Sequence, residues 1–309
     1  MEGSRSERAG PAEKCVITCA LSGVAANRDH CPAIPYTPED YAAEARRAYE
    51  SGASVVHIHA RYPDGTPSYR VQEYRDITLA ILSETPDIII NFSTGAVGVP
   101  IEERVRHITA LKPELGALNM GSMNYAKYSS RRKQVVFDFV FANPFSDITY
   151  LLEQMNSVNV KPECECFDTG HIGNVEPLID MGLLSGTIQF SLITGVLGGA
   201  PANPRTLAHM AELLPTDHTW EVIAISRDQW RMVAAAAALG GNIRVGLEDN
   251  FYLPDGEMAK SNGDLVESAA LSVQHSGRSV ASPADARALL FLPDNPDRSA
   301  LEHWKEEKR

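Results

Sequence analysis

Short apolar runs recur along the chain, and longer amphipathic segments separate them. The runs are rich in Val, Ile and other strand-forming residues, and eight of them predict β-strands, at residues 15–23, 54–61, 87–95, 116–122, 161–168, 187–195, 220–226 and 242–249. Helical periodicity appears between them at residues 37–52, 100–113, 203–215 and 226–241. The first of these helices has Thr37 as its N-cap, Pro38 in its first turn and Gly52 as its C-cap.

This alternation of strands and helices predicts right-handed βαβ units and a parallel sheet. Eight such units within 309 residues fit an α/β fold of the (β/α)8 TIM-barrel type. A doubly wound open sheet is the alternative, but the segment after the first strand, SGVAAN, lacks its usual Gly-rich phosphate turn. We predict one barrel domain over 14–309, with an insertion around 123–145, a C-terminal helical extension and a flexible tail over 1–13.

Composition and charge narrow the functional classes. The formal net charge of −12 argues against nucleic acids and anionic membranes as partners, because both require a basic surface. No apolar run reaches the length of a membrane span, and the polar first residues carry no secretory signal. Five cysteines without an export signal indicate a cytoplasmic protein with reduced thiols. Cys164 and Cys166 form a C-x-C pair that we interpret as core thiols, since no second pair completes a zinc cluster.

In a barrel of this kind the active site lies at the carboxyl ends of the strands. The second strand ends with His57 and His59, whose alternate spacing directs both imidazoles to one side. Two such rings suit a tetrahedral Zn²⁺ with a third, anionic ligand, and Glu248 at the end of the last strand is the natural choice. The alternative is that both are core histidines with satisfied hydrogen bonds.

The last strand carries further ionisable residues. Arg244 and Glu248 share a face with Gly246 between them, whereas Asp249 has the opposite parity and enters the site only if the strand ends there. Arg244 would then hold Asp249 ionised and oriented as a general base. A purely structural Arg–Asp pair is an equal alternative.

Other strand ends offer candidate substrate-binding groups. Ser93, Thr94 and Gly95 supply hydroxyls and backbone N–H groups suited to a carboxylate, although such a sequence is also ordinary turn composition. Glu163 and Glu165 share one face, and they either select a polar substrate end or pair with arginines inside the barrel. A basic cluster at 131–133 is either a contact for CoA phosphates or a solvated loop.

Several blocks together resemble a known family, the β-keto acid cleavage enzymes. The similarity covers about residues 15 to 290, and the segments that show it are PYTPEDYAAEARRAYESGASVVHIHAR, NFSTG, KPECECFDTGH and NIRVGLEDN. The resemblance implies a zinc-dependent, homotetrameric TIM barrel that uses acetyl-CoA to cleave a β-keto acid, giving acetoacetate and a new acyl-CoA.

Carried over by motif, the resemblance implies a role for each matching residue. His57, His59 and Glu248 correspond to the metal ligands. Asp249, supported by Arg244, resembles the base that takes the α-proton of acetyl-CoA. Ser93 and Gly95 resemble the groups that hold the carboxylate of the keto acid.

The chain departs from the family member that acts on 3-keto-5-aminohexanoate. Ala25 and Ala117 stand where that enzyme has an acidic and a hydroxyl residue, so the 5-amino substrate is in doubt and an uncharged or anionic β-keto acid is an equal candidate. The principal alternative function is a zinc-dependent aldolase or another metal-dependent C–C lyase. A barrel hydrolase of the amidohydrolase type would need histidines on the fifth and sixth strands, which have none. A non-catalytic scaffold would bind no metal.

Overall fold

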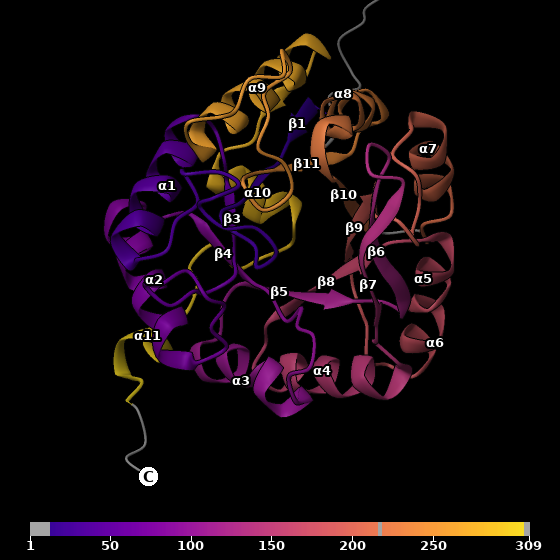
Figure 1. The fold of residues 1–309 in the computed structure, drawn as a ribbon. Helices are drawn as coiled ribbons and strands as arrows, with labels where there is room; N and C mark the ends of the chain where they lie inside the picture. Colours follow the sequence, from indigo (N-terminus) through magenta and orange to yellow (C-terminus); the bar gives the residue numbers. More distant parts are fainter. Residues whose placement is uncertain (1–12, 216–217, 306–309) are drawn as a thin grey trace, which may run out of the picture.

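A closed barrel of eight parallel strands forms the centre of the protein in the computed structural model, which describes residues 13–215 and 218–305 (Figure 1). The predicted TIM barrel is therefore confirmed. The strands follow one another around the barrel in the order β2 (Ile17–Ala20), β3 (Val55–Ile58), β4 (Ile89–Phe92), β5 (Leu115–Asn119), β8 (Lys161–Cys166), β9 (Ile188–Thr194), β10 (His218–Ala224) and β11 (Asn242–Val245), which pairs with β2 and closes the barrel.

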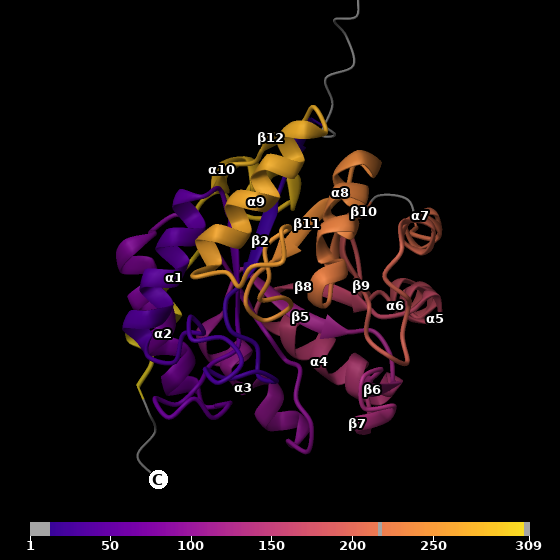
Figure 2. The ribbon, with the colours of Figure 1, turned by 45° about the horizontal axis from the view of Figure 1, so that its top comes forward.

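Helices surround the barrel and cover the outer faces of its strands (Figures 1 and 2). In chain order they are α1 (Pro38–Glu50), α2 (Val71–Glu84), α3 (Ile101–Leu111), α4 (Phe145–Ser157), α5 (Thr169–Gly173), α6 (Val175–Asp180), α7 (Pro204–Glu212), α8 (Gln229–Leu239) and α9 (Asn262–His275), with α10 (Pro283–Leu289) and α11 (Ser299–His303) after them. Within the described ranges, no helix has the length and apolarity that a bilayer crossing requires.

The amino ends of the strands are closed by the C-terminal part of the chain. β1 (Lys14–Cys15) pairs with β12 (Ser279–Val280), and α10 follows directly. A buried apolar cluster joins the strand starts to this segment; it consists of Val16, Val55, Ile89, Leu115, Ala281, Ala286, Leu290 and Leu292. The opposite, carboxyl end of the barrel is thereby left as the mouth.

Local sequence explains where α1 begins and ends. Thr37 caps the helix by accepting from the Asp40 N–H, and the Asp40 carboxylate accepts in return from the Thr37 N–H, which completes a capping box. The helix ends at Glu50 with Ser51 as its C-cap, so the predicted C-cap Gly52 is one residue too late. Gly52 follows with a φ of +114°, a conformation that favours glycine after a helix.

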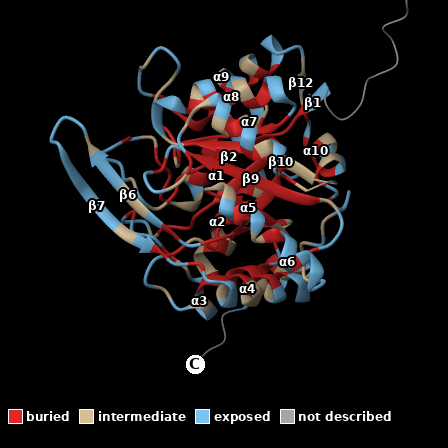
Figure 3. Ribbon diagram, turned by 90° about the vertical axis from the view of Figure 1, so that its right-hand side faces the viewer, coloured by how far each residue is buried: buried red, intermediate tan, exposed pale blue. Residues whose placement is uncertain are grey.

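A β-hairpin follows β5 and projects from the body beside the mouth (Figure 3). It consists of β6 (Met123–Ser129) and β7 (Gln134–Phe141), paired antiparallel. The hairpin lies within 123–145, where we expected an insertion. The basic cluster at 131–133 lies at the exposed turn of the hairpin. Residues 1–12 of the predicted N-terminal tail lie outside the described residues.

Candidate active site

Three predicted metal ligands converge at the mouth of the barrel. His57 lies on β3, His59 follows its end, and Glu248 lies in the turn after β11. Nε2 of His57 is 3.7 Å from one carboxylate oxygen of Glu248, and Nε2 of His59 is 3.5 Å from the other. Ligand atoms about 2.0–2.2 Å from one tetrahedral ion stand about 3.4 Å apart, so these distances suit a shared Zn²⁺.

Glu248 reaches this place through a turn, and the prediction that the strand continues to residue 249 is wrong. β11 ends at Val245, and Gly246 follows with a φ of +137°. The N–H groups of Asp249 and Asn250 both donate to the Gly246 carbonyl, which folds the chain back over the mouth. Strand parity therefore does not govern Glu248 or Asp249, and the early end of β11 brings both carboxylates into the site.

The protonation states of this group fit a cation. Burial lowers the pKa of His57 well below its usual value, and the nearby Arg244 adds to the effect, so the ring is held neutral as a metal ligand must be. Burial alone would raise the pKa of Glu248, but Arg244, His59 and His57 hold it well below the usual range. One Glu248 oxygen accepts from Arg244 at 2.8 Å, while the other is buried without a hydrogen-bond partner in the described chain. Such an oxygen fits a metal ligand.

Arg244 organises the acidic residues beside these ligands. Its guanidinium donates to both oxygens of Asp249, at 3.0 and 3.2 Å, and its Nη1 lies 3.6 Å from Glu165. Burial raises the pKa of Asp249 to about 6, with Arg244 opposing the rise. Burial and the neighbouring Glu163 raise the pKa of Glu165 to about 8. Asp249 thus has the proton affinity of a general base near neutral pH.

The turn after β4 contributes a polar corner. Ser93 Oγ accepts from the Gly95 N–H at 3.0 Å, and the ring of His107 on α3 contacts the Ser93 carbonyl at 2.8 Å. The Thr94 hydroxyl instead donates to the Ala117 carbonyl at 2.6 Å. A Cβ on Gly95 would stand 3.7 Å from the amide nitrogen of Asn119 and 4.0 Å from the His59 ring. The absence of a side chain at Gly95 leaves room beside these groups for a small anion.

Asn119 is a site residue that the sequence reasoning missed. It ends β5 and lines the cavity, and the available signal was a polar amide within the apolar part of the predicted strand 116–122. Glu221 on β10 was also missed. It lies deeper in the barrel, where Ser191 bridges it to Glu163 and Thr18 donates to it at 2.7 Å.

The polar groups face a cavity of about 320 Å³, within the usual range of small-molecule sites. Of the predicted substrate-binding residues, Ser93, Gly95 and Glu165 line it. Thr94 and Glu163 are buried behind its surface and are not among its described lining residues. Ala25 lies at the rim, whereas Ala117 is fully buried within β5 and does not belong to the described lining.

A buried arginine holds the rim on which Ala25 lies. Arg61 follows β3 and donates to the carbonyls of Ser22, Gly23 and Ala26 in the loop after β2, and to that of Gly65. These bonds fix a loop that would otherwise expose unpaired carbonyls to the barrel mouth. Arg61 therefore has a structural role, which is to hold the loop that carries Ala25 in place at the mouth of the barrel.

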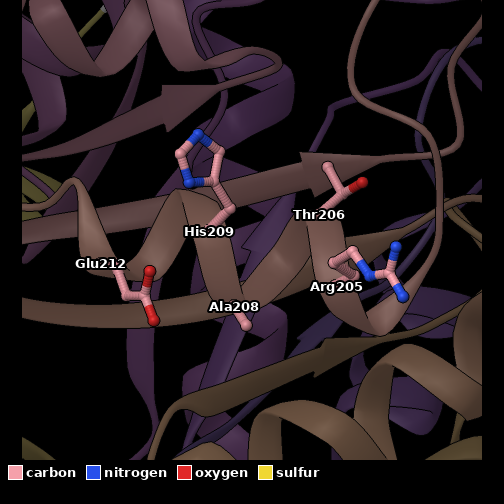
Figure 4. A pocket seen from close by; sticks show the side chains of 5 residues that line it. All are labelled: Arg205, Thr206, Ala208, His209 and Glu212. Atoms are coloured by element: carbon pink, nitrogen blue, oxygen red, sulfur yellow. The ribbon is translucent and has the colours of Figure 1, made fainter.

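A separate hollow lies on α7, away from the mouth (Figure 4). All of its described lining residues come from that one helix: Arg205, Thr206, Ala208, His209 and Glu212. No second element converges on it among the described residues, so we place the chemistry at the barrel mouth.

A (β/α)8 barrel with buried ionisable groups meeting at the carboxyl ends of its strands defines an enzyme active site. The model of the beta-keto acid cleavage enzyme family matches residues 14–292. The chain therefore belongs to the β-keto acid cleavage enzyme family.

Similar proteins span nearly the whole chain. A 3-keto-5-aminohexanoate cleavage enzyme of Acetoanaerobium sticklandii is 39% identical over 281 residues, covering 91% of this chain and 99% of the relative. A 3-oxoadipate:acetyl-CoA acetyltransferase of Cupriavidus necator is 32% identical over 284 residues, covering 91% of this chain and 96% of the relative. The apo structure of ObcA shares the fold, with a TM-score of 0.68 at 19% identity over 84% of this chain and 66% of that chain.

Proposed function

We propose that the protein is a zinc-dependent enzyme that converts a β-keto acid and acetyl-CoA into acetoacetate and a new acyl-CoA. The observation that carries the proposal is the convergence of His57, His59 and Glu248 beside an Arg244–Asp249 pair. Relatives named for acetyl-CoA-dependent transfers on different keto acids support the same kind of reaction.

The balance of atoms fixes which proton the base removes. Acetoacetate contains the acetyl group of acetyl-CoA joined to the carboxymethyl carbon of the keto acid. The nucleophile must therefore be C2 of the keto acid, and removal of a proton from acetyl-CoA does not lead to these products. Asp249 takes the C2 proton, the C2–acetyl bond forms, and CoA thiolate leaves. The thiolate then adds to the original keto carbon, and the bond from that carbon to C2 breaks, releasing acetoacetate after reprotonation at C2.

The chain's own groups position the reactants. When bound by His57, His59 and Glu248, Zn²⁺ would supply Lewis-acid polarisation of the keto group, which acidifies the C2 protons. Arg244 orients the Asp249 carboxylate through two hydrogen bonds and stabilises its ionised form. Ser93, Gly95 and Asn119 form the corner suited to the substrate carboxylate.

The test is an assay of the purified, zinc-loaded enzyme with β-keto acids and acetyl-CoA. We expect acetoacetate and the matching acyl-CoA in equal amounts, strict dependence on acetyl-CoA, and about one Zn²⁺ per chain. Cleavage without acetyl-CoA would indicate the aldolase alternative instead. A protein that binds no metal and forms no product would refute the proposal.

Two further expectations belong to the same proposal. We propose a cytoplasmic location, which the five buried, unpaired cysteines support, because reduced thiols persist in reducing compartments. We also propose a homo-oligomer, with a tetramer as the expected state. The exposed apolar residues of the β6–β7 hairpin support association, since such patches commonly mark interfaces.

A further inference from the structure

The cavity has one polar side and one extended apolar side. The polar side surrounds the metal ligands and the Ser93–Asn119 corner. The apolar side is formed by the inward face of the hairpin and by the ends of β8, β9 and β10. We call it the aromatic wall, and it consists of Tyr125, Phe137, Phe139, Phe141, Phe167, Ile193, Ile223 and Ile225.

Strand periodicity builds the hairpin half of this wall. Phe137, Phe139 and Phe141 alternate along β7, so their rings share the face that lines the cavity. Tyr125 stacks on Phe139 with ring centroids 5.2 Å apart and an angle of 8° between the planes. Behind them, Phe141 and Phe167 pack edge to face at 6.1 Å. The wall is an ordered apolar surface that is continuous with a buried cluster of the barrel.

The lining leaves no cation for a second anionic group on the substrate. Arg244 is the one Arg or Lys among the described lining residues. It already donates to Asp249 and Glu248, and its Nη1, which makes no hydrogen bond within the described chain, lies 3.6 Å from the Glu165 carboxylate. A carboxylate at the far end of a keto acid would therefore be buried against the wall without a partner, which is unfavourable.

The lining is equally unsuited to an amine at the substrate's far end. The acidic lining residues all contact Arg244; they are Glu165, Glu248 and Asp249. Elsewhere the lining presents the apolar residues Val24, Ala25, Ala96 and Val97. An ammonium group held there would lack a carboxylate partner among the described lining residues.

We propose that the β-keto acid of this enzyme carries an uncharged apolar substituent on its keto carbon, aliphatic or aromatic, and that the aromatic wall binds this substituent. The inference rests on the proposed function and names its substrate class. The wall suits this group better than the pantetheine arm of CoA, whose amides need hydrogen-bond partners. The Tyr125 hydroxyl is the one polar side-chain group of the wall.

The first experiment compares keto acids of similar size with acetyl-CoA and the zinc-loaded enzyme. The panel consists of 3-oxohexanoate, 3-oxooctanoate, 3-oxoadipate and 5-amino-3-oxohexanoate. For each keto acid, the rate of acetoacetate formation is measured and the acyl-CoA product is identified by mass spectrometry. We expect kcat/KM to rise about fourfold for each added methylene and to fall at least ~100-fold for the charged members. Acetoacetate formation with a preference for a charged keto acid would overturn this inference alone. No acetoacetate from any keto acid would overturn the proposed function.

The second experiment places a charge in the wall. Phe139→Arg should lower the ratio of kcat/KM for 3-oxooctanoate to kcat/KM for 3-oxoadipate at least ~100-fold. The buried guanidinium would be unfavourable beside the alkyl chain of 3-oxooctanoate and would pair with the second carboxylate of 3-oxoadipate. Asp138→Arg, at the adjacent exposed position, is the matched control and should leave the ratio unchanged. Phe139→Leu keeps the wall apolar and should retain the wild-type order of preference. If Phe139→Arg instead raised the KM for acetyl-CoA by the same factor whichever keto acid is used, the wall would bind CoA and the inference would be overturned.

Discussion

At the scale of single residues, Arg244 connects the metal ligands to the proposed base. One guanidinium is shared by Glu165 and Asp249, which are buried in the barrel mouth, and by Glu248, which is half-buried there. Isolated charges in such a place would be strongly unfavourable, and each carboxylate here offsets part of the desolvation of the arginine. The remaining free oxygen of Glu248 is then directed toward His57, while the oxygen that accepts from Arg244 lies near His59.

Removal of the Glu248 charge should release the metal. Glu248→Gln keeps the size and shape of the side chain but replaces the anionic carboxylate with a neutral amide, which is a poor ligand for Zn²⁺. We expect the zinc content of the purified variant, measured by atomic emission, to fall to about a tenth or less, with loss of the stabilisation that Zn²⁺ gives the wild type in thermal unfolding. Glu257→Gln, the same change at an exposed position after β11, is the control and should keep the metal. Full zinc occupancy in Glu248→Gln would contradict the assignment of this ligand.

A second residue-scale prediction concerns the carboxylates beneath the site. Burial and the neighbouring Glu163 raise the pKa of Glu221 from 4.5 to about 8. The folded protein therefore holds a proton that the unfolded chain releases between about pH 4.5 and 8, and the free energy of unfolding falls as the pH rises through this window. Gln cannot ionise but still accepts from Thr18.

We accordingly expect the Tm of Glu221→Gln to fall less than that of the wild type between about pH 6 and pH 9, by ~2 °C or more. Calorimetric scans at several pH values make the comparison. Glu102→Gln, on the exposed face of α3, should follow the wild-type curve. Parallel curves for Glu221→Gln and the wild type would mean that Glu221 is already ionised in the folded protein.

At the scale of elements, the sequence predicts the positions of the barrel strands better than it predicts the full set of residues that line the site. Apolar runs of strand-forming residues located most barrel strands, because burial on both faces leaves a continuous hydrophobic signal. β8 was also located, although Glu163 and Glu165 interrupt its apolar residues. The apolar runs could not reveal that β11 ends at Val245, since Leu247 continues the apolar pattern while packing in a turn. Asn119 and the wall on β7 were missed because their roles depend on which strand ends face one cavity, and this is a property of the closed barrel.

Gly246 is the residue on which the turn after β11 depends. A Cβ there would stand 2.2 Å from the Ala20 carbonyl oxygen, and its φ of +137° is unsuited to other residues. Gly246→Ala should therefore displace β11 from β2, lower the free energy of unfolding by about 3 kcal/mol, and reduce zinc binding by moving Glu248.

Gly240 provides the matched control for this substitution. It also has a positive φ, +86°, but a Cβ would meet nothing within 4 Å. Gly240→Ala should lose only about 1 kcal/mol in chemical denaturation and should keep full zinc occupancy. Equal losses of stability and unchanged zinc content in both variants would show that the close approach to Ala20 does not position Glu248.

At the scale of the whole molecule, the β6–β7 hairpin has two different faces. Aromatic residues of the hairpin line the cavity, while other apolar residues of it are exposed, with Val140 at 65%. Figure 3 shows β7 exposed along most of its length. No other described element carries as many exposed large apolar residues; those of the hairpin are Tyr128, Val135, Val136, Phe137 and Val140. A hairpin of this composition is unfavourable in water and favours a partner, for which we propose a second copy of the chain.

The double variant Val136→Lys/Val140→Lys tests this arrangement. Two buried, unpaired ammonium groups at a self-complementary interface are strongly unfavourable, so the variant should lose at least tenfold in association affinity. Light scattering coupled to size exclusion, over a range of concentrations, measures the mass in solution. Gln134→Lys, a polar exposed position on the same strand, should leave the wild-type mass unchanged. If the double variant keeps the wild-type mass at every concentration, the association surface lies elsewhere. If its mass in solution falls and it also loses acetoacetate formation, association holds the aromatic wall in place over the cavity.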